Sequence, residues 1–199
     1  LSGAINIITK KPDGKDHTYL NTSYGTWRTS KTTFIQEGKS GDTNYMITGD
    51  YKKSDGFIPS TDYEGHDFTL RMDMANGVTL RSGYTDNNYS NSNTKHTDAK
   101  GKTFYSDDRN KVNTYYFDLE KKFSSDRADT TIRAYYSYYN PVVTVPNYPT
   151  YSDWEDSMQG LALQQDIKLG KQHTFTWGSE FQNIKANDLK DLTAANIGR

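Results

Sequence analysis

Apolar and polar residues alternate along most of this sequence, and this alternation constrains the fold more than any other feature. In the segment 67–74 every even-numbered residue is apolar and every odd-numbered residue is polar or charged. The segments 114–120 and 174–181 repeat the pattern. Because successive side chains of a β-strand point to opposite faces, each segment would have one apolar and one polar face.

We therefore predict an all-β fold, an antiparallel up-and-down meander of about nine strands. The predicted strands are 17–24, 29–37, 44–51, 67–74, 78–86, 114–120, 129–139, 158–168 and 174–181.

The predicted connections differ in length in a regular way. Tight turns are expected at 39–42, 75–77, 124–127 and 170–172, and long loops at 52–66, 88–112 and 140–157. Alternate connections of a meander lie at opposite ends of the sheet, so the long loops would gather at one end. Only the short hairpin at 25–27 departs from this rule. Short turns at one end and long loops at the other are typical of transmembrane β-barrels.

A soluble antiparallel sandwich would show the same alternation. Such a protein would bury its apolar faces between two sheets, whereas a barrel wall would leave them for lipid. Charged residues at Asp67, Arg71 and Asp73 favour a barrel with a polar lumen. The alternative function is therefore a soluble β-protein that binds glycans or surfaces through loop aromatics.

Composition excludes several other classes. Twenty-four Lys and Arg balance 25 Asp and Glu, which argues against a nucleic-acid partner. The sequence has no Cys, and its four His are scattered without a ligand spacing. It has no nucleophile or phosphate-binding motif. We expect no enzyme activity and no required cofactor.

The segment 2–12, Ser-Gly-Ala-Ile-Asn-Ile-Ile-Thr-Lys-Lys-Pro, closely resembles the end of the plug domain in TonB-dependent outer-membrane receptors. The aromatic, Gly-rich stretch around Tyr24-Gly25 is also similar to the first barrel strand of that family. The resemblance implies that residues 1–12 are the last plug strand and connector, and that 13–199 are the N-terminal part of a 22-stranded barrel. Because an open sheet leaves unpaired edges in lipid, we expect these strands to belong to a longer chain.

The family resemblance also implies a function. The complete protein would lie in the outer membrane of a diderm bacterium and import a scarce nutrient with energy from TonB. Its ligand would be a ferric siderophore or cobalamin (a corrin), with haem a weaker alternative, and TonB would contact a plug segment outside this sequence. A passive porin fits the strands but not the plug-like start. By alternation, six polar residues would face the lumen and contact the plug: Arg71, Asp73, Asp118, Glu120, Arg133 and Glu180.

Two groups of residues in the expected long loops are candidate sites. Acidic residues of neighbouring loops could together bind Ca²⁺, an ion that takes six to eight oxygen ligands, as the loops of cobalamin receptors do. These residues are Asp62, Glu64, Asp107 and Asp108, and the alternative is that they are ordinary solvated acids. The loop 140–154 is stiffened by three prolines and offers Tyr148, Tyr151 and Trp154 to a ligand. Its alternative role is packing on neighbouring loops or in an aromatic belt.

Overall fold

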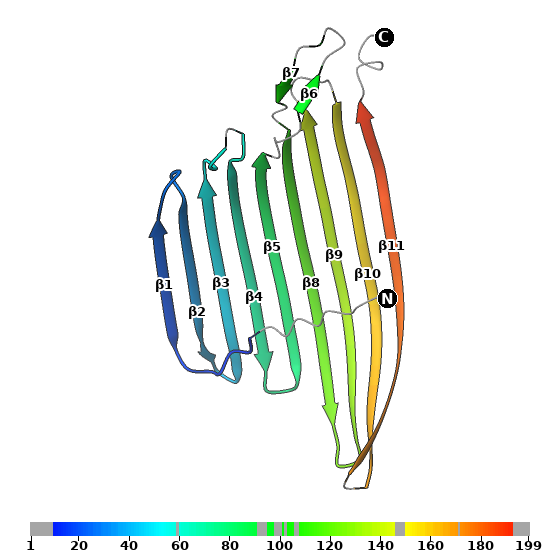
Figure 1. Ribbon diagram of the computed structural model, residues 1–199. Helices are drawn as coiled ribbons and strands as arrows, with labels where there is room; N and C mark the ends of the chain where they lie inside the picture. The colour runs from blue at the N-terminus through cyan, green and yellow to red at the C-terminus, as the bar shows by residue number, and fades with distance from the viewer. Residues whose placement is uncertain are drawn as a thin grey trace.

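The chain folds into β-strands (Figure 1). A computed structural model describes residues 10–58, 60–90, 95–97, 101, 103–105, 108–145, 150–170 and 172–192. The strands are β1 His17–Tyr24, β2 Ser30–Ser40, β3 Thr43–Ser54, β4 Tyr63–Met74, β5 Val78–Ser90, β6 Lys95–Thr97, β7 Thr103–Tyr105, β8 Arg109–Ser124, β9 Ala128–Val145, β10 Thr150–Leu169 and β11 His173–Leu192. The described residues contain no helix that could cross a membrane.

Nine strands form one sheet in the order β1-β2-β3-β4-β5-β8-β9-β10-β11, each antiparallel to its neighbours. The predicted nine-stranded meander is confirmed. At one end, drawn at the bottom of Figure 1, tight turns connect the strands; we call this the turn end. At the other, the loop end, lie the longer connections, as predicted. The Asn76-Gly77 turn has the expected geometry, with Gly77 at a φ of 79°.

All three predicted long loops are wrong in part. The loop 52–66 is shorter than expected, because β3 continues to Ser54 and β4 begins at Tyr63. The expected loop 140–157 is mostly strand, because β9 continues to Val145 and β10 begins at Thr150. Pro141 suggested a loop. In the structure, the β9–β10 pairing skips this proline: the register passes from Tyr139↔Asp156 directly to Val142↔Asp153. The proline nitrogen therefore need not donate to β10. The expected loop 88–112 begins only after Ser90 and contains the β6–β7 hairpin, which is too short for alternation to reveal.

The described residues of the sheet form no apolar core. None of the described hydrophobic side chains is buried, whereas the buried polar residues include Glu37, Arg71 and Asp118. We call the face that carries Phe68 and Phe181 the outward face. On it, Phe68 is 47% exposed and Phe181 is 72% exposed. A sandwich would bury this face against a second sheet, and the structure instead leaves it open.

The outward apolar band crosses the sheet obliquely. One register row runs from Leu20 on β1 through Phe68 and Tyr84 to Lys185 on β11. On β1 the loop-side limit of the band is Tyr24, about four residues to the loop side of this row. On β11 the same limit is Phe181, about four residues to the turn side of the row. With ~3.3 Å per residue and ~4.8 Å between strands, this slope is roughly 35°. Barrel strands tilt by a similar angle, about 35–45°, from the barrel axis.

Charged pairs mark the loop-side limit of the band. On the same outward face, Lys53 on β3 lies 3.3 Å from Glu64 on β4, and Asp86 on β5 lies 3.9 Å from Lys111 on β8. The outward face is therefore apolar across its middle and ionic toward the loop end.

Candidate functional site: the polar face of the sheet

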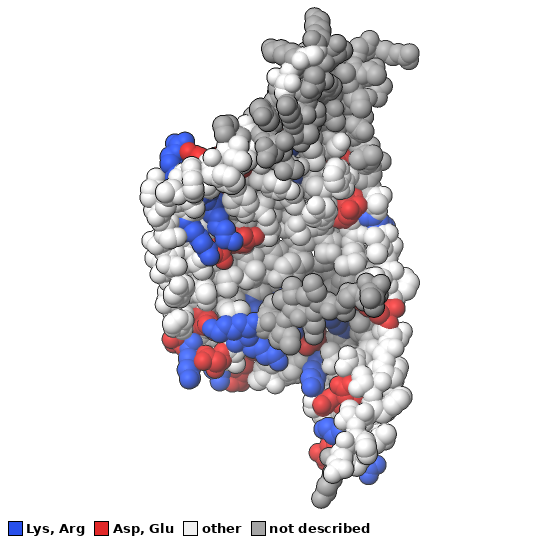
Figure 2. Space-filling model, in the orientation of Figure 1, with Lys and Arg blue, Asp and Glu red and all other residues white. Residues whose placement is uncertain are grey.

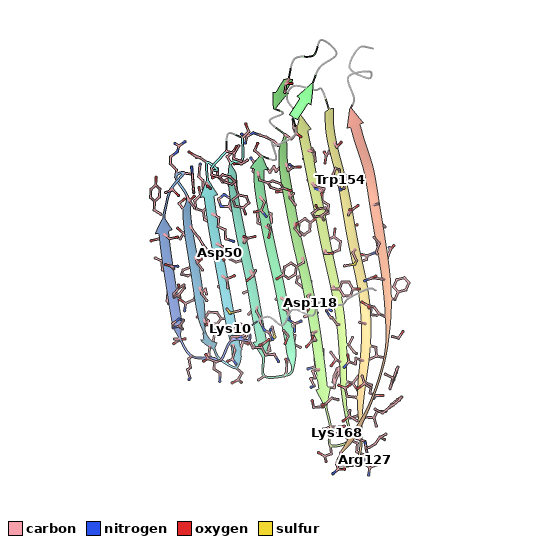
Figure 3. The ribbon with its side chains drawn as sticks, in the orientation of Figure 1. Lys10, Asp50, Asp118, Arg127, Trp154 and Lys168 are labelled. Carbon is pink, nitrogen blue, oxygen red and sulfur yellow. The ribbon has the colours of Figure 1, made fainter. Side chains whose placement is uncertain are left out.

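The face opposite the apolar band carries charged side chains of both signs, intermingled (Figure 2). Asp118 on β8 is the centre of the largest ionic network (Figure 3). Its Oδ1 accepts a hydrogen bond of 2.6 Å from Arg81 Nη1, and its Oδ2 accepts one from Arg133 Nε. Arg81 also lies 3.3 Å from Glu120. Asp118 is only 4% exposed, because these partners cover it on an otherwise open face.

Two smaller clusters flank this network. On β4, Arg71 Nε donates to both carboxylate oxygens of Asp73, at 3.0 and 3.1 Å. On the far side, the Tyr135 hydroxyl donates to Glu180, and Gln182 Nε2 donates to that hydroxyl at 2.8 Å.

The register places all six predicted lumen residues on this one face. Two rows connect them: Asp73 with Glu120, Arg133 and Glu180, and Arg71 with Asp118. Whether they contact a plug remains a prediction. Sequence reasoning missed Arg81 and Tyr135, although both have the parity of the polar face in predicted strands. Strand parity assigns the face, but it does not reveal the ion pairs.

The segment before β1 also contacts the polar face. Lys10 forms an ion pair with Glu37 on β2, a side chain that is 2% exposed. A Cβ at Gly14 would lie 2.7 Å from Asn44 Oδ1 on β3, so the backbone passes close to the sheet there. The predicted plug strand and connector, residues 1–12, lies mostly outside the described residues.

A shallow hollow of about 330 Å³ lies between β10 and β11. Small side chains at Ala162, Gly178 and Ser179 leave this space, and Glu180 borders it. The hollow adjoins the Tyr135 cluster and is open to solvent. It offers one carboxylate to a small polar group.

The candidate calcium ligands do not form a cluster among the residues that the structure describes. Asp62 accepts a hydrogen bond of 3.1 Å from Arg109 Nη1, and Glu64 pairs with Lys53. Asp108 is partly buried, and Asp107 lies outside the described residues. Calcium binding by these acids remains a prediction.

Two of the three aromatic candidates belong to a strand rather than to a long loop. Tyr151 and Trp154 lie in β10, and Trp154 has its backbone oxygen 3.0 Å from Asn140 Nδ2 on β9. Tyr148 lies outside the described residues. Their contact with a ligand remains a prediction.

Sequence reasoning also missed the contacts of a corner at the loop end. Trp27 packs edge-on against Phe57 with ring centroids 6.1 Å apart, and Arg28 pairs with Asp55. Asp55 N donates to Trp27 O at 2.9 Å. Trp27 and Arg28 both have positive φ, a conformation unusual outside glycine. The corner presents two exposed aromatic rings at the loop end.

A single antiparallel sheet, apolar outside, charged inside and sloped in this way, is part of a transmembrane β-barrel wall. Among solved structures, the chain is similar to the pyoverdine outer membrane receptor FpvA from Pseudomonas aeruginosa PAO1, bound to pyoverdine. The TM-score is 0.61 and the sequence identity is 13%, over 89% of this chain and 32% of that chain. This chain therefore spans about a third of that receptor. No family model and no curated protein matches the sequence.

Proposed function

We propose that this chain is part of the barrel of a TonB-dependent outer-membrane receptor that binds and imports a small-molecule chelate. The ligand would be a ferric siderophore or cobalamin, and haem is the weaker candidate. Ligand binding and gating, rather than the breaking of a bond, would be the basis of this activity. The partners would be outer-membrane lipid on the apolar face, a plug on the polar face, and TonB through that plug.

The observation that carries the proposal is the inversion of the two faces. Apolar side chains such as Phe68 stay exposed on the outer face, while Asp118 and Arg71 are buried on the inner one. This arrangement is favourable only where lipid covers the outside and a polar body or water fills the inside. The glycan-binding alternative requires a soluble sheet, for which this outer face would be a large exposed apolar patch.

The test is uptake by the host bacterium with and without the gene that contains this sequence. Cells limited for iron receive radiolabelled ferric chelates one at a time, and cells limited for cobalamin receive cyanocobalamin. The proposal predicts that deletion abolishes uptake of at least one ligand, that the gene restores it, and that a strain without TonB behaves like the deletion. Unchanged uptake of every ligand would refute it.

Calcium binding forms a separable part of the proposal, since it concerns Asp62, Glu64, Asp107 and Asp108 only. Calorimetric titration of the purified protein with CaCl₂ should give heat that is lost when Asp107 and Asp108 are both replaced by Asn. The matched control is Asp129→Asn at the turn end. Absence of heat in the unaltered protein would remove calcium from the account.

A further inference from the structure

Two lysines face each other on the polar side of the sheet, near the loop end. Lys31 on β2 and Lys52 on β3 are direct register partners. Both share a face with Thr33 and Asp50, the next pair toward the turn end, and therefore with the ionic network. Opposed residues in an antiparallel pair have Cβ atoms about 5 Å apart, and like charges in that position repel each other.

Neither lysine has an ion-pair partner among the described residues. Other lysines do: Lys53 pairs with Glu64, Lys111 with Asp86 and Lys122 with Asp129. No carboxylate of the described residues therefore lies within 4 Å of either ammonium group.

Two acids lie in the next row of the same face. Asp50 and Asp67 are opposed one step toward the turn end. Asp50 accepts a hydrogen bond of 2.6 Å from Thr33, and Asp67 accepts one of 2.8 Å from Thr85. An anion would be repelled from that side and attracted to the lysines from the loop end. In Figure 2 the basic atoms over β2 and β3 lie beside acidic ones.

The row neighbours of the two lysines differ on the two sides of the pair. In the same row, the small Ser23 on β1 lies next to Lys31 and leaves room beside it, and Gly65 on β4 lies next to Lys52. Tyr63 and Asn87 close over Gly65, with the tyrosine hydroxyl 2.6 Å from Asn87 Oδ1. The Tyr63 hydroxyl uses its hydrogen in that bond, so Asn87 Nδ2 is the group left to donate beside the two ammonium groups.

We propose that Lys31 and Lys52 form an anion-binding site for a carboxylate or phosphate group of the ligand. The inference deepens the proposed function, because the polar face must be a lumen open to the loop end. It makes the two lysines specificity determinants that favour an anionic chelate over a neutral one. An anion between the two ammonium groups would lower the electrostatic repulsion between them.

Trace acetylation of lysines in the purified protein, with and without inorganic pyrophosphate, tests the site without any assumption about transport. Mass spectrometry reports the reactivity of each lysine separately. At a pyrophosphate concentration ten times its dissociation constant, about one-tenth of the sites stay free. The reactivity of Lys31 and Lys52 should therefore fall by about tenfold.

Lys39 is the matched control, because it lies on the same strand and the same face but opposes Asn44 near the turn end. Its reactivity should not change. Lys52→Glu places a carboxylate opposite Lys31 and should abolish the protection of Lys31 by pyrophosphate. Equal protection of Lys31, Lys52 and Lys39, or full protection of Lys31 in Lys52→Glu, would overturn the site. A receptor that imports no chelate yet shows the protection would refute the proposed function and leave the anion site intact.

Discussion

At the scale of the single residue, Asp118 shows how an open sheet can bury a carboxylate. Arg81 and Arg133 approach it from the two neighbouring strands and exclude water. Removing one member of a buried ionic group leaves its partners uncompensated, which costs more than the intact group contributes.

We predict that Asp118→Asn lowers the free energy of unfolding by about 3 kcal/mol, because two guanidinium groups lose the charge between them. Urea titration of the detergent-solubilised protein, followed by Trp fluorescence, measures the loss. The control, Asp129→Asn, breaks a more exposed ion pair with Lys122 at 3.6 Å, and should cost less than about 1 kcal/mol. Equal losses in the two variants would show that the Asp118 network stabilises the protein no more than an exposed ion pair does.

The same residues show what alternation can and cannot predict. Parity alone places Asp118, Glu120 and Arg133 on the polar face, since a strand has only two faces. It does not predict which carboxylate pairs with which cation. That pairing depends on the register between neighbouring strands, which the turns determine.

At the scale of the element, tyrosines lie over glycines on neighbouring strands. Tyr135 lies opposite Gly160, and Tyr116 lies opposite Gly83. A Cβ at Gly160 would lie 2.4 Å from the Tyr135 ring, and one at Gly83 would lie 2.3 Å from Tyr116. Aromatic rings that cover glycines in this way fix the register of a sheet.

Gly160→Val should destabilise the protein by about 1–3 kcal/mol, because the new side chain displaces Tyr135 from Glu180 and Gln182. The measurement is again urea titration in detergent. Gly49→Val is the matched control, since a Cβ there meets nothing within 4 Å. If both substitutions are tolerated equally, the ring does not hold the register.

The lipid-facing side of β4 gives a second prediction at this scale. Leu70→Arg should cost about 2–4 kcal/mol of membrane-folded stability, the cost of an arginine on the lipid face near the bilayer midplane. Thr69→Arg, one residue away on the polar face, should cost much less. Heat-modifiable mobility after refolding into lipid vesicles gives the folded fraction, and equal losses would contradict the assignment of faces.

Strand bounds were harder to predict than strand faces. The β-branched run 142–145 is strand, although Pro141 and the nearby prolines suggested a loop. A proline interrupts a strand only where its missing N–H is needed, and that depends on the neighbouring strand rather than on the local sequence. The expected bounds of the loop 140–157 were wrong in part for this reason.

At the scale of the whole molecule, the two faces of the sheet have the polarities expected of a barrel wall in a lipid bilayer. The apolar band faces outward, the ionic network faces inward, and the band descends by roughly one residue per strand. The pattern was visible in the sequence as alternation, but the slope was not, because it requires the register of all nine strands.

The most direct test of this account is the accessibility of single residues along β4. The sequence contains no Cys, so a spin label attached to one introduced Cys reports one position. In lipid vesicles, labels at Phe68, Leu70 and Met72 should be relaxed by oxygen and shielded from a water-soluble nickel chelate. Labels at Thr69 and Arg71 should show less oxygen relaxation. Uniform accessibility along 68–72, or access of the nickel chelate to the even-numbered positions, would contradict the central claim that lipid covers the apolar face.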